Sequence, residues 1–261
     1  MNTPSGPVRK MVRWLGNRDV IDPLVFFVLL LMVWEFGVRA FGVKGYLLPA
    51  PSQILRSAWV ARTTLAVHTW VTLKEVVIGF VLATVLGVVA ATAIFFVPFL
   101  RRTLYPLLIA LQGIPKIGLA PIVIVWLGYG LSSKVLMTLL FALFPILIAT
   151  LGGYRSTPEP LVEHFAALRA STWQTLWHLR IPSALPGFID GCKVAMPLAV
   201  IGAVVGEFIG SYEGLGNLIM VASGASNTGL TFAALGAVTL LSIALFYVIE
   251  GLGRFVWWQS R

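Results

Sequence analysis

Several uninterrupted apolar runs, each about 20 residues long, constrain this chain more than any other feature of its sequence, because that length lets a helix cross a hydrocarbon core of about 30 Å. A soluble domain carries about a quarter charged residues. This chain of 261 residues is 58% hydrophobic and only 11% charged. Membrane β-barrels instead show short alternating strands, which the sequence lacks. We therefore predict an all-α polytopic membrane protein.

The apolar runs predict six transmembrane helices and a simple domain plan. The predicted spans are 23–42, 71–98, 104–127, 133–152, 187–210 and 231–256. We expect 23–256 to form one transmembrane domain, between tails at 1–22 and 257–261. A polar segment, residues 153–186, interrupts it between the fourth and fifth spans.

The distribution of Lys and Arg predicts how the chain is oriented, because cytoplasmic loops carry an excess of basic residues. Eleven fall on one side of the spans: Arg9, Lys10, Arg13, Arg18, Arg101, Arg102, Arg155, Arg169, Arg180, Arg254 and Arg261. Five fall on the other: Arg39, Lys44, Arg56, Arg62 and Lys134. The bias places both termini, both tails and the segment 153–186 in the cytoplasm.

Several classes of function find no support in the sequence. The net charge of +9 comes from loops beside spans, and no basic face with interleaved aromatics indicates nucleic-acid binding. The single cysteine, Cys192, lies in an apolar run, so neither a disulfide framework nor a Cys-based metal site is expected. Neither H-E-x-x-H, G-x-S-x-G nor a phosphate-binding G-x-x-x-x-G-K-[ST] occurs. We predict a non-catalytic protein without a metal or cofactor of its own, so any ATP hydrolysis would come from another chain.

Two short helices are predicted within the polar segment, from EPLVEHFAALRASTWQTLWHLRIPSALP at 159–186. Residues Glu163 to Arg169 suit one helix. Ser171 can cap a second, with Gln174 completing a capping box. Pro182 and Pro186 close the segment and begin the fifth span. A rigid pair of helices outside the membrane can pass force from a soluble motor to the spans. The second helix would present an apolar face of Trp173, Leu176 and Trp177.

These positions resemble the coupling segment, or EAA loop, of bacterial ABC importer permeases. The family pattern is Glu-Ala-Ala, three residues, Gly, then a run ending in Leu-Pro. Glu163 stands first, Ala170–Ser171 follow the glycine position, and Ile181–Pro182 stands at the Leu-Pro, with Pro186 four residues on. Three further segments are similar to the nitrate, sulfonate and bicarbonate branch, and the resemblance covers roughly 25–255. They are LPAPSQIL (48–55), GIPKIGLAPIVIVWLGYG (113–130) and GEFIGSYEGLGNLI (206–219).

The resemblance assigns ATPase coupling to a set of residues in the polar segment, with two departures from the family pattern. His164 and Phe165 replace the two alanines, and Arg169 replaces the glycine. Glycine is favoured where φ is positive, so we expect arginine to make that turn less easy. The coupling residues implied are Glu163, His164, Phe165, Ala166, Ala167, Arg169, Ala170, Ser171, Pro182 and Pro186.

The resemblance also implies a fold, partners and a location. The fold would be the six-span, MetI-like core of type I importers, in the lipid of a bacterial inner membrane. Two permease copies would stand over two ATPase subunits, which use ATP and Mg²⁺, while an extracytoplasmic binding protein delivers a solute for alternating access. The solute would be a small anion such as sulfonate, nitrate or bicarbonate, with a pyrimidine or vitamin precursor as the alternative. An ATP-independent secondary carrier is the other class, but it would show broken helices in both halves.

The third span is the one clearly broken helix, with Pro106, Gly113, Pro115, Gly118 and Pro121. Proline removes a helix hydrogen bond, and irregular backbone at membrane depth persists only where protein or a water-filled cavity covers it. We therefore expect this span to face the interior of the protein.

Three polar side chains within the spans are candidates for the translocation path or gate. Charged residues in a membrane are functional candidates by default. Lys116, with Gln112 one turn earlier on the same face, would form a positive patch suited to an anion, or Lys116 would pair with an acid elsewhere. Glu207, just before the turn Gly214–Gly216, would line the outer gate or bond neighbouring backbone.

Two rows of small residues at four-residue spacing allow close helix contacts. They pack helices within one chain, or one row lies at a subunit interface. The rows are Gly79, Ala83, Gly87 and Ala91, and Gly202, Gly206 and Gly210.

Overall fold

The computed structural model describes the backbone of residues 7–256 and the side chains of residues 21–254. Within this part the chain is built from helices without strands. The elements in chain order are α1 Pro7–Ala40, α2 Pro51–Val60, α3 Arg62–Phe96, α4 Pro98–Gln112, η1 Lys116–Leu119, α5 Ala120–Leu127, α6 Leu131–Arg155, α7 Glu159–Ala167, α8 Thr172–Thr175, η2 Leu176–Arg180, α9 Ile181–Gly210, α10 Leu215–Gly224 and α11 Thr228–Val256.

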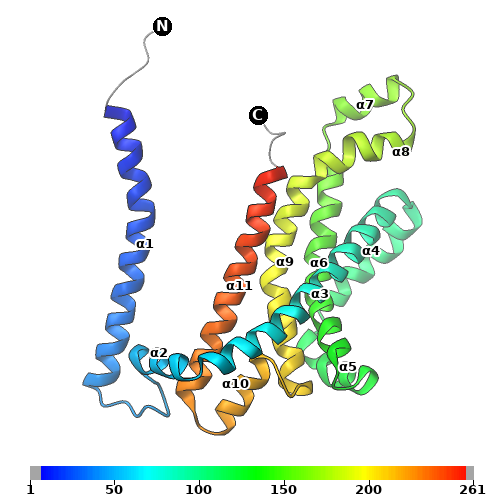
Figure 1. The fold of residues 1–261 in the computed structure, drawn as a ribbon. Helices are drawn as coiled ribbons and strands as arrows, with labels where there is room; N and C mark the ends of the chain where they lie inside the picture. The colour runs from blue at the N-terminus through cyan, green and yellow to red at the C-terminus, as the bar shows by residue number, and fades with distance from the viewer. Residues whose placement is uncertain (1–6, 257–261) are drawn as a thin grey trace.

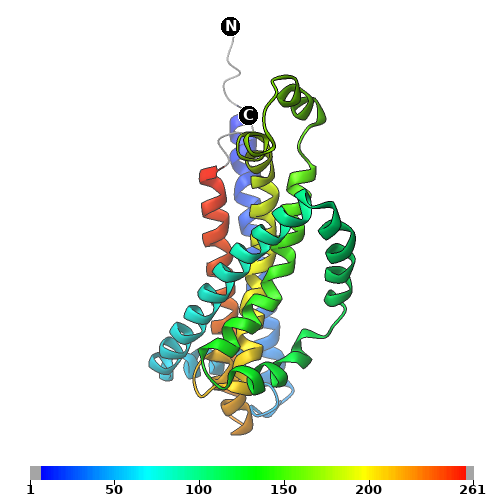
Figure 2. The ribbon, with the colours of Figure 1, turned by 90° about the vertical axis from the view of Figure 1, so that its right-hand side faces the viewer.

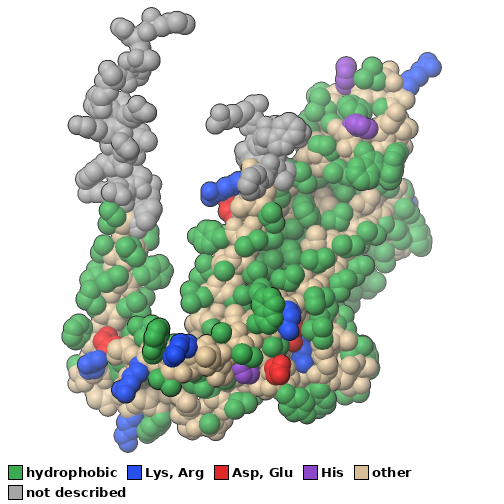
Figure 3. Space-filling view, viewed as in Figure 1, with side chains coloured by type: hydrophobic (Ala, Val, Ile, Leu, Met, Phe, Trp, Pro, Cys, Tyr) green, Lys and Arg blue, Asp and Glu red, His purple; other side chains and the backbone are tan. Residues whose placement is uncertain are grey.

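The structure confirms an all-helical membrane fold with five helices long and apolar enough to span a bilayer, or six with the bent pair α4–α5 counted as one. The five single spans are 21–40, 62–96, 131–155, 172–210 and 228–254. On the face in Figure 3, hydrophobic side chains cover the middle of the bundle, and charged ones lie mainly toward its ends. The predicted tail 1–22 overlaps α1, which is helical from Pro7. The tail 257–261 lies outside the described residues.

The third predicted span differs most from the expectation. Its axis turns by 93° between α4 and the helices that follow, at the break Gly113–Pro115. The first half, α4, buries no residue in the single chain, and Figure 2 shows it standing away from the bundle. Within one chain, the expected burial of this span is therefore confirmed only for its second half. Only α5 buries side chains there, namely Ala120, Val123 and Ile124.

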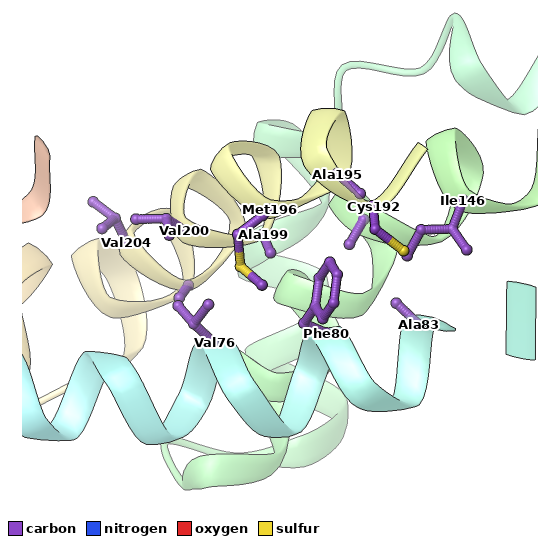
Figure 4. Packing of buried hydrophobic residues seen from close by; sticks show 12 residues of the cluster. Val76, Phe80, Ala83, Ile146, Cys192, Ala195, Met196, Ala199, Val200 and Val204 are labelled. Atoms are coloured by element: carbon purple, nitrogen blue, oxygen red, sulfur yellow. The ribbon is translucent and has the colours of Figure 1, made fainter. Parts of the chain in front are cut away.

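Three helices, α3, α6 and α9, form the centre of the bundle (Figure 4). Val76 and Phe80 of α3 meet Met196 and Val200 of α9, and Ile146 of α6 completes this cluster. The small residues make the close approach possible. A Cβ added at Gly202 would lie 2.8 Å from the Met137 carbonyl oxygen and 2.9 Å from the Thr138 Cα atom.

Both rows of small residues pack helices within the chain, which was the first of the two predicted alternatives. On α3, Gly79 faces Thr138 and Gly87 faces Ile146. On α9, Gly206 faces Lys134 of α6 and Gly210 faces Ile124 of α5. Neither row is left exposed for a second subunit.

The helix ends sort into two groups at opposite ends of the molecule. The first residues of α1, the last residues of α11 and the pair α7–α8 share one end, whereas α2, α5 and α10 lie at the other (Figure 1). This arrangement agrees with the connectivity predicted from the basic residues. α1 stands apart from the bundle and is tied to α2, where Glu35 accepts hydrogen bonds from the Ser52 amide (3.0 Å) and hydroxyl (2.8 Å).

Candidate coupling segment and membrane polar groups

The predicted coupling segment forms two short helices joined by a tight turn. The first, α7, begins at Glu159, four residues before the predicted start, and ends at Ala167. The Arg169 amide bonds the Ala166 carbonyl (2.9 Å), and the Ala170 amide bonds the Phe165 carbonyl (3.0 Å). These two bonds form a Schellman motif, which usually has glycine in the left-handed position after the helix.

Arg169 occupies that left-handed position with φ of 54°. The resemblance to the family is therefore correct about the backbone, although this chain has arginine where the pattern has glycine. A residue with a Cβ atom is strained in this conformation by about 1–2 kcal/mol. The chain thus makes the same turn as a glycine-bearing segment, at a cost in local stability.

Replacing Arg169 by glycine should stabilise the turn by about 0.5–1 kcal/mol, because the left-handed strain is removed. Hydrogen exchange of the amides in 159–175 would measure the gain as slower exchange. Leu168→Gly is the matched control, since Leu168 has an ordinary φ of −76° and glycine there should only loosen the turn. Equal or faster exchange in Arg169→Gly would contradict the strain argument.

The second helix of the segment begins as predicted but does not end at the prolines. The Ser171 amide donates to Gln174 Oε1 (2.7 Å) and the Gln174 amide to Ser171 Oγ (3.2 Å), which completes the capping box. α8 then continues through the π-helical turn η2 into α9, so residues 172–210 form one helical span. Pro182 lies just after the π-helical turn η2, and Pro186 lies inside α9.

Contacts with α6 and α3 fix the base of the segment while its tip stays exposed. The Arg180 guanidinium donates to the Tyr154 carbonyl (3.0 Å) and lies 4.7 Å from the centre of the Phe95 ring. Leu176 is buried against Tyr154 and Ala184. The other two members of the predicted apolar face, Trp173 and Trp177, pack on each other and remain more than half exposed. Exposed members of the predicted set are Glu163, His164, Ala166, Ala167, Arg169, Ser171 and Pro186, whereas Phe165, Ala170 and Pro182 are half-buried.

Glu207 is fully buried. Of its two predicted roles, the structure shows the second, hydrogen bonding to neighbouring backbone. It accepts hydrogen bonds from the Thr72 hydroxyl (2.7 Å) and the Gly216 amide (2.5 Å). The Thr72 hydroxyl accepts from the Leu215 amide (2.9 Å), and His68 Nδ1 accepts from the Gly214 amide (3.0 Å). These bonds fasten the hairpin at 211–216 to α3.

Lys116 and Gln112 lie together, but not on one continuous helix as predicted. α4 ends at Gln112, and Lys116 begins the next helix after the bend. Both line a hollow of about 150 Å³ whose remaining walls are apolar. Among the side chains of residues 21–254, Lys116 has no ion-pair partner, so the predicted pairing with an acid is wrong for this part of the chain. Its Nζ atom lies 5.5 Å from the centre of the Phe141 ring.

A second, larger pocket contains charged residues that the sequence analysis did not single out. It has a volume of about 420 Å³ and opens between α3, α6 and the hairpin after α9. Glu75 was overlooked although it is an acidic residue inside the second apolar run, which marks a candidate site. Its lining residues are Val71, Lys74, Glu75, Ile78, Tyr129, Gly130, Leu131, Lys134, Ser211, Tyr212 and Glu213.

A known protein family matches most of this chain. The model of the family described as "Binding-protein-dependent transport system inner membrane component" matches residues 83–256. The chain belongs to this family. It is the permease subunit of an ABC importer, a multi-pass protein of the inner membrane, and members of the family are non-catalytic, which confirms that prediction.

Three relatives cover between 76% and 91% of the chain. A probable ABC transporter permease of Haemophilus influenzae is 34% identical over 239 residues, 91% of this chain and 98% of the relative. The formylaminopyrimidine transport permease ThiX of Halalkalibacterium halodurans is 41% identical over 199 residues, 76% and 79% of the two chains. The riboflavin transport permease RibX of Chloroflexus aurantiacus is 38% identical over 230 residues, 87% and 85%.

The predicted sulfonate branch and MetI-like fold are also confirmed as likenesses. The taurine transport permease TauC of Escherichia coli is 24% identical over 249 residues, 93% of this chain and 90% of the relative. Among solved structures, the inward-facing MetNI methionine ABC transporter matches with a TM-score of 0.61 and 22% identity. The match covers 74% of this chain and 95% of the matched MetNI chain. At this identity it establishes the fold alone.

Proposed function

We propose that this permease carries a small nitrogen heterocycle, such as a pyrimidine or vitamin precursor, into the cytoplasm by ATP-driven alternating access. The observation that carries the substrate class is the pair of relatives at 41% and 38% identity, named for formylaminopyrimidine and riboflavin transport. The taurine relative is more distant, at 24% identity. The small anion expected from the sequence therefore becomes the second candidate.

The proposed partners are two ATPase subunits, a second permease copy, an extracytoplasmic binding protein and membrane lipid. ATP and Mg²⁺ would be used by the ATPase, which contacts the residues Glu163 to Ser171. Support comes from the exposed tip of α7 and α8, which carries polar and apolar side chains on a base anchored by Arg180 and Leu176. The termini and this segment would face the cytoplasm, as the excess of basic residues indicates.

Force would travel from the coupling segment along one continuous helix. Residues 172–210 are 39 consecutive helical residues; the chain turns where α8 and η2 meet α9 (Figure 1), and the 30 residues of α9 extend over roughly 45 Å at about 1.5 Å per residue. The far end carries Glu207, whose carboxylate is bonded to Thr72 and Gly216. Movement of the segment by the ATPase would therefore reach the hairpin at the outer face through η2 and α9, which contains Pro186 and Pro197.

The test is uptake by the complete transporter in proteoliposomes with its cognate ATPase and binding protein. We expect ATP-dependent accumulation of a labelled aminopyrimidine and no accumulation with a non-hydrolysable ATP analogue. Failure of any ATPase to co-purify with the permease would contradict the coupling role. Accumulation of ethanesulfonate but no heterocycle would contradict the substrate class.

The second candidate, transport of a small anion, is favoured by Lys116. Its ammonium faces an apolar hollow and has no acidic partner among the described side chains. Lys116→Met should lower uptake of a sulfonate at least about tenfold, because an anion loses its charged partner. Lys116→Arg, which keeps the charge, is the control. Wild-type uptake by Lys116→Met would leave the lysine a structural role only.

A further inference from the structure

We propose that the 420 Å³ pocket between α3, α6 and the hairpin 211–216 is a solute-binding site within the permease itself, for a planar nitrogen heterocycle that carries an exocyclic amine. The inference rests on the proposed function, because it names where the membrane subunit would hold the imported heterocycle. A volume of this size lies within the range of about 300–1,000 Å³ that small-molecule sites occupy.

Two charged side chains in the wall of the pocket are almost completely buried. Glu75 is 3% exposed and Lys134 is 4% exposed. Glu75 Oε2 is buried without a hydrogen-bond partner in the described part of the chain. A buried polar atom without a partner is costly, and native proteins retain such atoms chiefly where function requires them. Glu75 also lies beside the buried carboxyl group of Glu207, so a ligand that donates an N–H group would approach it from the pocket, whose wall includes Glu75.

Lys134 supplies a hydrogen-bond donor, whereas Glu75 supplies an acceptor. Its Nζ atom donates to the Tyr129 carbonyl at 2.7 Å, and an ammonium carries more N–H groups than this bond uses. An aminopyrimidine presents an amine donor beside a ring-nitrogen acceptor. The acceptor on Glu75 and the donor on Lys134 match that edge.

The pocket wall carries basic and acidic side chains together, which argues against a simple ion as the occupant. Two lysines, Lys74 and Lys134, line it together with two glutamates, Glu75 and Glu213. An inorganic or sulfonate anion would meet the carboxylates, and a simple cation would meet the ammonium groups. A neutral polar heterocycle satisfies both signs through hydrogen bonds.

Two tyrosines at the pocket offer a stacking surface. The rings of Tyr129 and Tyr212 lie 6.3 Å apart between centres and are 60% and 85% exposed. Stacked aromatic rings lie about 4.5–7 Å apart, so no third ring fits between these two. The heterocycle would instead stack on the free face of one ring, with its polar edge toward Glu75.

The proposal is tested by direct binding to the permease–ATPase complex in lipid nanodiscs, without the binding protein. The probes are 4-amino-2-methylpyrimidine, 2-methylpyrimidine and ethanesulfonate. We expect saturable binding of the amine, and at least about tenfold weaker binding of 2-methylpyrimidine, which lacks the donor for Glu75. Glu75→Gln should weaken binding of the amine at least about tenfold and leave 2-methylpyrimidine unchanged.

Two further variants separate recognition from folding. Tyr212→Ala changes an exposed loop residue and should weaken both pyrimidines by several fold through lost stacking. Glu35→Gln makes the same chemical change in α1, outside the pocket, and should bind like the wild type. The proposal is overturned by absence of saturable binding, by equal loss of both pyrimidines in Glu75→Gln, or by stronger binding of ethanesulfonate.

The outcome also distinguishes this site from the transport function. ATP-driven uptake of the aminopyrimidine without binding to the permease would refute the site and retain the function. Binding to the permease without ATP-driven uptake would retain the site and refute the function.

Discussion

Reversing the charge of Glu163 to lysine is expected to abolish the stimulation of ATP hydrolysis by loaded binding protein, and uptake with it. Glu163 is exposed on α7. Within residues 21–254 its carboxylate takes part in no ion pair. The fold therefore loses little, whereas an ATPase surface that matches the negative charge would now meet a positive one. Like charges in an interface cost several kcal/mol, so we expect at least about a tenfold fall in the coupled rate.

Two controls separate loss of coupling from loss of the protein. Glu163→Gln keeps the shape and removes only the charge, and its effect should be intermediate. Membrane insertion and thermal unfolding of the permease should match the wild type in both variants. A coupled ATPase rate unchanged in Glu163→Lys would show that this residue does not contact the ATPase productively.

Replacing Gly214 by alanine is expected to destabilise the protein by about 2–5 kcal/mol, from backbone strain and a clash together. Gly214 has φ of 100° and ψ of 162°, a region that residues with a side chain rarely enter. A Cβ atom there would also overlap the Glu207 carboxylate. The clash would displace the carboxylate that holds the Gly216 amide and the Thr72 hydroxyl.

Gly128→Ala isolates the first of these two effects. Gly128 has φ of 76° and ψ of −176°, and an added Cβ would meet nothing within 4 Å. This variant should lose only the strain energy, about 1–3 kcal/mol. Thermal unfolding of both variants in the same detergent measures the difference. Equal losses would show that Glu207 yields freely and does not hold the hairpin rigidly.

The local features of the coupling segment could be predicted from sequence because they depend on neighbouring residues. The capping box of Ser171 and Gln174 joins residues three apart. The left-handed turn at Arg169 directly follows α7. It was expected only because the family pattern has glycine at this position. The end of the second helix was wrong, because Pro182 was interpreted as a stop. The helix instead continues from the π-helical turn η2 past both Pro182 and Pro186.

Groups that meet across the bundle could not be predicted from their spacing. Thr72 and Glu207 are 135 residues apart, and His68 and Gly214 are 146 apart. Lys134 was counted among the loop lysines but is buried beside Gly206. The angle of the bend after Gln112, 93°, could not be predicted either, because prolines indicate that a helix breaks but not by what angle.

The sequence by itself determined the class of protein, most of its spans and the two short helices of the predicted coupling segment. The length of apolar runs, the basic residues in loops and local capping each depend on residues that are close together in the sequence. They can therefore be predicted without a structure. Only the tertiary structure decided which small residues face which helix, that Glu207 fastens a hairpin, and that Glu75 and Lys134 share a pocket with two tyrosines. Those relations arise from the packing of α3, α6 and α9, where helices distant in sequence come within contact range and bury charges that would otherwise face water or lipid.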